Sequence, residues 1–178
     1  MNAVSELYNR IENLHLWEKS VVLERNQYLA EYGAVEKKLY YVVSGSLKVC
    51  MRDGKEEHIV RFGYQGDFIT ALDSFISGKP SDFYIQAIKR TEVKVISKAA
   101  YLSFVALNPA NRQLWQDMLE QLVLQQLERE KDMLTSSPKD RYQRVLKRSP
   151  QLFQQIPHKH IASYLRMAPE TLSRLKKS

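Results

Sequence analysis

The side chains best suited to specific chemistry lie near the end of the chain, after Pro169. Glu170, Thr171, Ser173 and Arg174 follow this proline within five residues. Residues four apart share one face of a helix, so Glu170 and Arg174 would project together. An arginine can donate two hydrogen bonds to guanine O6 and N7, and a glutamate can accept one from cytosine N4. The spacing therefore predicts base contacts by Glu170 and Arg174, with Thr171 and Ser173 beside them.

Basic side chains surround this segment. The net charge of the chain is +7, yet residues 135–178 contain ten Lys or Arg and only two Asp or Glu, whereas the remaining residues contain 17 and 18. Charge segregated in this way is typical of a protein that binds nucleic acid. The candidates for contacts with DNA phosphates are His158, Lys159, Arg166, Lys176 and Lys177.

Two short helices separated by a turn would position these side chains. The apolar residues recur at helical spacing on either side of residues 166–168: Ile161, Ala162 and Leu165 before them, Leu172 and Leu175 after them. Pro169 suits the first turn of the second helix, where its missing N–H has no partner to lose. This pattern predicts a helix-turn-helix. The alternative is a helical hairpin that packs on a core and leaves a solvated basic face.

The longest helical pattern begins after Asn108, a plausible cap, and runs from Pro109 to about Ser136. Such a helix of about 27 residues would be about 40 Å long, which exceeds the needs of a small domain. We therefore expect it to pack against a second copy of the chain. Alternatively, the helix lies across its own barrel, and part of its apolar side packs there. The apolar stripe consists of Trp115, Met118, Leu119, Leu122, Val123 and Leu127.

The first hundred residues show a different hydrophobic pattern, with one short helix followed by short strands. Val4, Leu7, Tyr8, Ile11 and Leu14 predict a short amphipathic helix, and β-type runs interrupted by glycines follow from Val21. Residues 39–51 read as two strands with a break at residues 44–45, and residues 53–54 form a hairpin turn signal. In the second strand, Leu47, Val49 and Met51 alternate with Lys48, Cys50 and Arg52, which predicts a half-buried strand. Frequent short strands indicate a sandwich or barrel.

Several classes of protein are excluded by composition. No apolar run approaches the ~18 residues of a membrane span, and residues 1–19 are too polar for a signal peptide, so we expect a cytoplasmic protein without a membrane partner. The single cysteine, Cys50, rules out an internal disulfide and argues against cysteine-ligated zinc or iron–sulfur sites. Haem ligation by His15 or His58 stays a minor alternative. His158 and His160 lie at a helix start and better suit DNA phosphates than a cupin-type metal.

Four segments carry a resemblance to a known family. Residues 39–49 read LYYVVSGSLKV, residues 66–69 read GDFI, and residues 161–165 and 169–174 read IASYL and PETLSR. Together they resemble the cyclic-AMP receptor/Fnr (Crp/Fnr) family of bacterial transcription regulators, particularly its shorter Bacteroidetes members. The resemblance implies an α+β fold: a double-stranded β-helix or jelly-roll barrel over residues 1–108, a dimerisation helix over 109–136, and a winged-helix-like helix-turn-helix over 137–178. Because the chain ends at residue 178, we expect little or no wing.

The resemblance also locates an effector pocket. Family members that bind a cyclic nucleotide carry Gly-Glu-Leu after the GDFI segment and Arg-Ser/Thr-Ala about ten residues later. Without a gap, these triplets fall on Thr70, Ala71 and Leu72 and on Ser81, Asp82 and Phe83. The polar ligands are all changed, and Asp82 would repel a phosphate. We therefore expect a degenerate pocket that does not bind cyclic AMP in the usual mode, no cofactor, and an unknown small-molecule effector at most.

The function that the resemblance implies is transcription regulation by a homodimer on a near-palindromic DNA site. Its partners would be double-stranded DNA and a second copy of the chain, with RNA polymerase as a further candidate. No nucleophile triad, paired acids or Gly-rich phosphate loop is present, so we expect no enzyme. Arg166 stands where the family often has glycine and must adopt a glycine-like turn, and Pro169 replaces a common arginine. The alternative is a barrel that binds a small molecule or protein and no longer reads DNA specifically.

Overall fold

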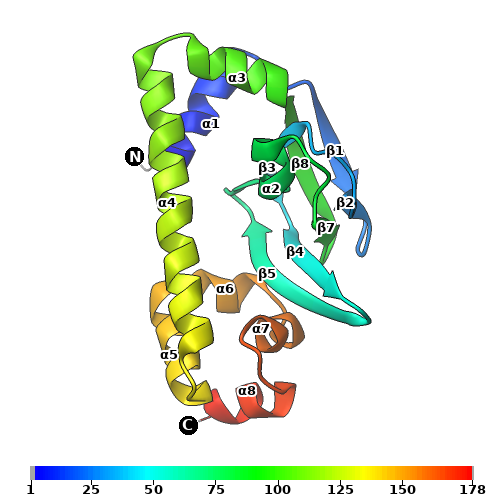
Figure 1. Ribbon diagram of the computed structural model, residues 1–178, viewed down its shortest axis with the longest axis vertical. Helices are drawn as coiled ribbons and strands as arrows, with labels where there is room; N and C mark the ends of the chain where they lie inside the picture. The colour runs from blue at the N-terminus through cyan, green and yellow to red at the C-terminus, as the bar shows by residue number, and fades with distance from the viewer. Residues whose placement is uncertain (1–2, 178) are drawn as a thin grey trace. The chain divides into compact units, whose positions relative to one another are not determined.

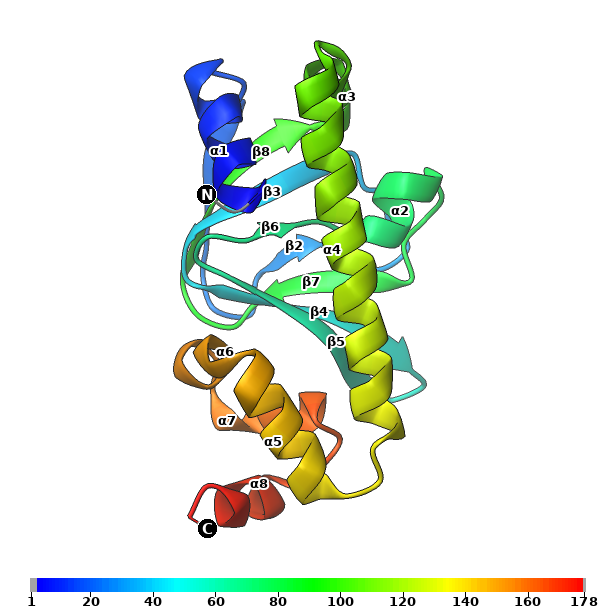
Figure 2. The ribbon, with the colours of Figure 1, turned by 90° about the vertical axis from the view of Figure 1, so that its left-hand side faces the viewer.

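The protein is described by a computed structural model over residues 3–177, which form two compact units that meet in the chain between residues 120 and 121 (Figures 1 and 2). Unit 1 ends at Glu120, and unit 2 begins at Gln121. The long helix α4 (Pro109–Leu134) contributes its first half to unit 1 and its second half to unit 2. The expected division into three segments at residues 108 and 136 stays a prediction. Residues 1 and 2 of the first segment and residue 178 of the last one lie outside the described residues.

Unit 1 contains two four-stranded sheets in which every pair of neighbouring strands is antiparallel (Figure 1). The first sheet has the order β1 (Lys19–Leu23), β8 (Thr91–Ser97), β3 (Lys38–Ser44), β6 (Phe68–Ile69). The second has the order β2 (Tyr28–Ala30), β7 (Phe83–Ala87), β4 (Ser46–Asp53), β5 (Glu56–Tyr64). Strands that follow each other in the chain alternate between the sheets several times. This arrangement confirms the expected jelly-roll-like barrel.

Apolar side chains from both sheets fill the barrel. Val42, Leu47 and Val93 are fully buried in one cluster that also includes residues of β1 and β7. The break between β3 and β4 falls at Gly45, whose φ of 91° belongs to the left-handed region. A Cβ at this position would collide with Thr91, so a glycine is required for the two strands to meet there. The predicted break at residues 44–45 is confirmed.

The expected alternation of buried and exposed residues along β4 is wrong in its detail. Lys48 and Cys50 are buried, whereas Met51 is 36% exposed. The Lys48 ammonium donates a hydrogen bond to Glu57 on β5 at 2.5 Å, and the hydroxyl of Tyr84 on β7 donates to the same carboxylate. These partners on neighbouring strands cover the face that we expected to be solvated. Burial raises the pKa of the Cys50 thiol to about 12.

Three helices complete unit 1: α1 (Ala3–Asn13), α2 (Leu72–Ser77) and α3 (Lys98–Ala106). The predicted first helix is confirmed, with Leu7 and Ile11 fully buried. Tyr8 of α1 stacks on Tyr41 of β3 with ring centroids 4.3 Å apart, which fixes the helix on the outer face of the first sheet. The predicted cap of α4 is also confirmed, because Asn108 Oδ1 accepts a hydrogen bond from the third residue after it at 2.9 Å.

Part of the apolar stripe on α4 belongs to unit 1 rather than to a dimer face. Met118 is 9% exposed and packs in the second core cluster with residues of α1 and α3. Trp115 meets the ring of Tyr101 edge-on, with centroids 5.3 Å apart, and also contacts Phe75. Both residues were expected at the dimer contact. The alternative interpretation, a helix that lies on its own barrel, accounts for these two positions.

Unit 2 contains the end of α4 and four shorter helices: α5 (Pro138–Arg148), α6 (Pro150–Gln155), α7 (His158–Tyr164) and α8 (Pro169–Leu175). Ser137 caps α5 by accepting a hydrogen bond from the Asp140 N–H at 3.2 Å, as its position before Pro138 predicts. Most of the segment between Pro150 and Pro157 is helical. Residues 121–177 contain no strand. Over the described chain, no helix is both long and apolar enough to cross a membrane.

Candidate nucleic-acid interface

The two-helix element at the end of unit 2 has the predicted core. Ile161, Ala162 and Leu165 are fully buried, and Leu172 is 1% exposed. The chain leaves α7 through Arg166, whose φ of 51° lies in the left-handed region that favours glycine. The glycine-like turn expected at Arg166 is therefore confirmed. Because Leu172 anchors one side of α8, its opposite side faces away from the unit.

Two arginines from preceding helices hold this turn. Arg129 of α4 lies 3.6 Å from the ring centroid of Tyr164 and donates to the Tyr164 carbonyl at 2.5 Å. Arg141 of α5 donates to the carbonyls of Thr135 and Arg166, at 2.9 and 3.3 Å. The last carbonyls of a helix lack partners within it, and these guanidinium groups supply them. Neither role could be predicted from the sequence, because both arginines are far from the turn along the chain.

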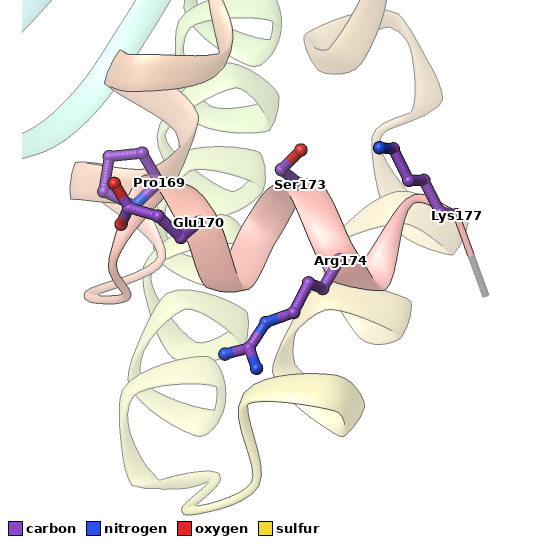
Figure 3. Close-up of a pocket in the computed structure, with 5 residues that line it drawn as sticks. All are labelled: Pro169, Glu170, Ser173, Arg174 and Lys177. Atoms are coloured by element: carbon purple, nitrogen blue, oxygen red, sulfur yellow. The ribbon is translucent and has the colours of Figure 1, made fainter.

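The base-contact candidates lie on the outer side of α8. Pro169, Glu170, Ser173, Arg174 and Lys177 line a shallow hollow of about 390 Å³ (Figure 3). Glu170, Ser173 and Arg174 are exposed, and none of the described residues forms an ion pair with Glu170 or Arg174. Figure 3 shows the Ser173 and Arg174 side chains leaving the helix in different directions. These groups are available to an external partner.

Thr171 differs from the other three base-contact candidates. It is half-buried beside Leu172, so its side chain is less available than theirs. The five phosphate candidates, in contrast, are all exposed: His158, Lys159, Arg166, Lys176 and Lys177. Two of them touch, because Lys176 Nζ lies 2.5 Å from Nε2 of His158. The structure thus brings the start of α7 and the end of α8 together.

Some of the basic residues counted toward the charge of this region are bound internally. Arg144 Nε and Arg148 NH2 lie 3.2 and 2.5 Å from the carboxylate of Asp132, which is fully buried. Both arginines also approach Glu128. The hydrogen bond to Asp132 raises the pKa of Arg148. Even so, unit 2 contains 12 Lys or Arg and five Asp or Glu, whereas unit 1 contains 15 of each, so the net charge of +7 lies entirely in unit 2.

The first triplet of the expected effector pocket offers few free polar groups. Thr70 donates its hydroxyl hydrogen to the Lys38 carbonyl at 2.8 Å. Ala71 is 1% exposed and belongs to the barrel core, at the position where cyclic-nucleotide-binding relatives would have glutamate. Leu72 begins α2 and is half-buried. This part of the pocket presents no carboxylate to a ribose.

The second triplet is bonded to a residue that the sequence analysis missed. Asp73 accepts the Ser81 hydroxyl at 2.8 Å and the Asp82 N–H at 2.9 Å, one on each carboxylate oxygen. Ser81 in turn accepts the Phe83 N–H at 3.0 Å, and Phe83 packs against the barrel core. A carboxylate of the chain thus takes two donors that could otherwise hold an anion. Asp73 lies eight residues before Ser81, so only the fold reveals the pairing.

The remaining candidates for a dimer contact lie in two groups along α4. Leu119 and Leu122 are half-buried, whereas Val123 and Leu127 are 59% and 47% exposed. Leu124, which the sequence analysis did not include, is 56% exposed. Three large apolar side chains thus face solvent within five residues of one helix.

Among residues 3–177, no three His, Cys, Asp or Glu side chains are grouped so as to hold a metal ion.

Comparison with known proteins gives one family match. A sequence model described as the cyclic nucleotide-binding domain matches residues 20–108, half of the chain. The chain belongs to the cyclic nucleotide-binding domain family. The matched residues include the strands of the barrel from β1 to β8, except Lys19 at the start of β1, together with α2 and α3.

Individual relatives of this family agree. The cAMP-activated global transcriptional regulator CRP of Salmonella typhimurium is 33% identical over 82 residues, 46% of this chain and 39% of that protein. The chain thus matches well under half the length of this curated relative. FixK2 from Bradyrhizobium japonicum aligns with a TM-score of 0.70 at 17% identity, over 89% of this chain and 82% of that one. A CooA variant from Carboxydothermus hydrogenoformans gives 0.73 at 15%, over 93% and 77%.

These matches confirm the Crp/Fnr resemblance and its fold. At such low identity, the two solved structures are similar to this chain in fold alone. The Bacteroidetes subgroup and the absence of a wing stay predictions.

Proposed function

We propose that the protein is a DNA-binding transcription regulator whose α8 reads bases in the major groove. The observation that carries this proposal is the outer side of α8. Glu170 and Arg174 are exposed one turn apart, while Leu172 fixes the opposite side in the core. Arg174 would donate to guanine O6 and N7, and Glu170 would accept from cytosine N4. Ser173 adds an exposed hydroxyl that leaves α8 in another direction than Arg174.

The charge of unit 2 supports binding to the DNA backbone. His158, Lys159, Arg166, Lys176 and Lys177 are exposed around the two-helix element. Phosphate contacts position a protein on DNA without reading sequence, and they make the affinity fall steeply as salt rises. Unit 1, with a net charge of zero, would not contribute to this attraction.

The proposal includes a homodimer. Val123, Leu124 and Leu127 are the exposed apolar residues of α4 that a second copy would cover. A symmetric pair would place two α8 helices about 34 Å apart, in successive major grooves of a near-palindromic site. The cytoplasm would be its place of action, and RNA polymerase would be a further partner. We propose no enzymatic activity.

The effector, if the barrel has one, is not cyclic AMP in the usual mode. Ala71 replaces the expected ribose ligand, and Asp73 occupies two donors of the second triplet. A phosphate would have to displace this carboxylate and then face Asp82. The relatives called cAMP-activated are therefore no guide to the ligand of this chain.

The test is selection of DNA sequences from a random duplex pool by the purified full chain, with and without cell extract. A regulator should enrich one motif with two related half-sites. Arg174→Ala should lose the motif, whereas Lys55→Ala, which removes the same charge from the exposed turn after β4, should keep it. Absence of an enriched motif under both conditions would favour the other candidate function.

That second candidate is a barrel module that binds a small molecule or protein and no longer reads DNA specifically. Two observations favour it: Thr171 is half-buried, and Pro169 occupies a position where the family commonly has arginine. It predicts salt-dependent binding to any duplex without sequence preference. Sedimentation of Leu127→Glu tests the dimer separately, since a charge on this face should shift the chain toward monomer.

A further inference from the structure

We propose that Arg129 and Arg141 fix the angle of α8 relative to α4, and that they thereby set the separation of the two half-sites that a dimer reads. This inference rests on the proposed function, because it needs a homodimer whose α8 helices read bases. It goes further by assigning the spacing of the DNA site to two residues that would not contact DNA themselves. Both are positioning residues.

Arg129 connects α4 directly to the end of α7. Its guanidinium group donates to the Tyr164 carbonyl at 2.5 Å and lies 3.6 Å from the centroid of the Tyr164 ring. Tyr164 is the last residue of α7, and α8 begins five residues later at Pro169. One side chain of α4 thus holds the residue before the turn both by its backbone and by its ring.

Arg141 of α5 makes the second connection. Its Nη1 donates to the carbonyl of Thr135, the residue directly after α4, at 2.9 Å. Its Nη2 donates to the carbonyl of Arg166, in the turn, at 3.3 Å. A guanidinium group is planar, and its donors have fixed directions. The end of α4 and the turn before α8 are therefore held in one orientation relative to each other.

The turn between α7 and α8 needs such support. Arg166 has a φ of 51°, which costs free energy for a residue with a side chain. A strained backbone persists only where the surrounding contacts determine it. The buried Leu172 holds α8 against the unit, but apolar contacts are not directional and do not fix an angle. We therefore assign the angle of α8 to the hydrogen bonds of Arg129 and Arg141.

Helix α4 carries the proposed dimer face on its other side. Val123 and Leu127, which a second copy would cover, are 59% and 47% exposed. Leu127 and Arg129 are two residues apart, so they project about 200° apart around a helix of 3.6 residues per turn. One rigid helix thus lies between the proposed two-fold axis and the turn before α8. The angle between α4 and α8 then decides how far apart the two α8 helices meet the DNA.

Stability alone does not explain the placement of Arg129. None of the ion pairs among the described residues includes Arg129, whereas Arg144 and Arg148 both bind Asp132. Burial lowers the pKa of Arg129, because it disfavours the charged form. A charge that is buried without a carboxylate partner is costly for the fold. A role in positioning gives a reason for this cost.

The experiment compares the affinity for a selected DNA site with that for the same site lengthened by one base pair between its half-sites. This insertion moves the second half-site by about 3.4 Å and turns it by about 35°. The unaltered full chain should bind the lengthened site about tenfold more weakly or worse, because one half-site is then misread. The ratio of the two dissociation constants is the spacing discrimination.

Arg129→Met keeps a long, unbranched side chain and removes the charge and the donors. It should lower the spacing discrimination by about fivefold, a typical coupling between two sites. The sequence of each half-site should stay the same, because Glu170 and Arg174 are unchanged. Loss of stability alone would weaken binding to both DNA sites equally and would leave their ratio as it was.

Arg141→Met removes both hydrogen bonds of Arg141 and should have the same effect, which provides an independent variant. Arg129→Lys keeps the charge and can donate to a carbonyl, but it has no plane to stack on a ring, so we expect an intermediate discrimination. This mildest change decides the test should neither methionine variant fold.

Arg144→Lys is the matched control. Arg144 is also a guanidinium bound within unit 2, but its partners are Asp132 and Glu128 rather than the turn. This variant should keep the spacing discrimination of the unaltered chain even where it lowers the midpoint of thermal unfolding. Circular dichroism measures that midpoint for every variant.

The outcomes are distinguishable. Undiminished spacing discrimination in the folded variants of Arg129 and Arg141 overturns this inference and leaves the proposed function standing. An equal loss in Arg144→Lys does the same, since a general loosening of unit 2 would then explain it. Selection of single half-sites by the unaltered chain overturns the inference and the homodimer, but not base reading by α8. Absence of any enriched motif overturns the proposed function as well.

Discussion

The segment from Thr70 to Phe83 and the outer side of α8 both carry polar residues at positions where the family binds a ligand. These positions are the ones that the resemblance predicts, not ones at which a ligand is seen. In the first segment, Thr70, Asp73, Ser81 and the N–H of Asp82 bond to one another or to the backbone. On α8, Glu170 and Arg174 are exposed without ion pairs among the described residues. A polar group whose bonds are made inside the chain has little to offer a ligand, because binding would first break them. Exposed groups on a fixed helix carry no such cost.

The same contrast separates the arginines of unit 2. Arg144 and Arg148 neutralise Asp132 and Glu128 within the unit, whereas Arg166 and Arg174 are exposed. Charge counted along the sequence does not distinguish the two groups. The internal arginines are bound to carboxylates of the unit, and the exposed ones form no ion pair with any described residue.

The largest effect that tests this contrast is expected at Asp132. Asp132→Ala removes the buried carboxylate shared by Arg144 and Arg148, and leaves both with Glu128 alone. Removing one member of a fully buried ion pair costs about 3–5 kcal/mol, and we expect the lower end here because the two arginines are partly exposed. Denaturant unfolding should show this loss, whereas the exposed Glu130→Ala should stay within about 0.5 kcal/mol. Equal, small losses in both variants would mean that the internal arginines are not structural.

A smaller effect, on DNA affinity alone, is expected at Arg174. Arg174→Ala should weaken binding to the selected site by about 1–3 kcal/mol and relax the preference at one position per half-site. Its free energy of unfolding should not change, because the side chain is exposed. Affinity is measured by fluorescence anisotropy on duplexes with each base at that position. Uniform weakening on every duplex would assign Arg174 to a phosphate instead.

In the barrel, Asp73→Ala should lower the free energy of unfolding by about 1–2 kcal/mol, because the buried Ser81 hydroxyl loses its acceptor. It should not create binding of cyclic AMP, since Ala71 still replaces the ribose ligand. Calorimetric titration checks the second point, and the exposed Glu31→Ala serves as control for the loss of one charge. Cyclic AMP binding by the variant would show that Asp73 alone had closed the pocket.

The smallest effect concerns Glu36, a buried carboxyl group beneath α2. Its pKa is raised by burial, against hydrogen bonds from backbone N–H groups and from Tyr40. An acid with a raised pKa in the folded state binds more protons there, so stability falls as pH rises from the ordinary value of about 4.3 toward the raised one. Glu36→Gln should therefore flatten the pH dependence of the free energy of unfolding from about pH 4 upward. A pH dependence that is steeper in Glu36→Gln than in the unaltered chain would show that a group other than Glu36 has the raised pKa.

Local patterns predicted those parts of the fold whose signals lie within a few residues. Gly45 and Gly54 marked turns, and the buried residues of α7 and α8 followed helical spacing. Helix α3 was missed, because its largely apolar stretch shows no clear helical face and follows a strand directly. The partners of a side chain could not be predicted in this way.

The errors at the candidate sites share this origin. Lys48 was expected to face solvent, but its ammonium binds Glu57 of β5. Met118 was expected at a dimer contact, but residues of α1 and α3 cover it. Asp73 showed no sign of its role, since its partners begin eight residues later. Glu170 and Arg174 were easier to place, because exposure on a helix depends mainly on its own periodicity. Whether they contact bases stays a prediction.

Cys50 has a practical consequence for all of these measurements. It is the single cysteine of the chain, it is fully buried in β4, and its thiol is held protonated. Thiol reagents act on the thiolate, so in the native protein they can react only after strand β4 opens. The rate of alkylation therefore measures how often β4 opens, and no label has to be introduced. For the same reason, a cysteine introduced on α8 could be tagged selectively in the folded protein, with Cys50 left untouched.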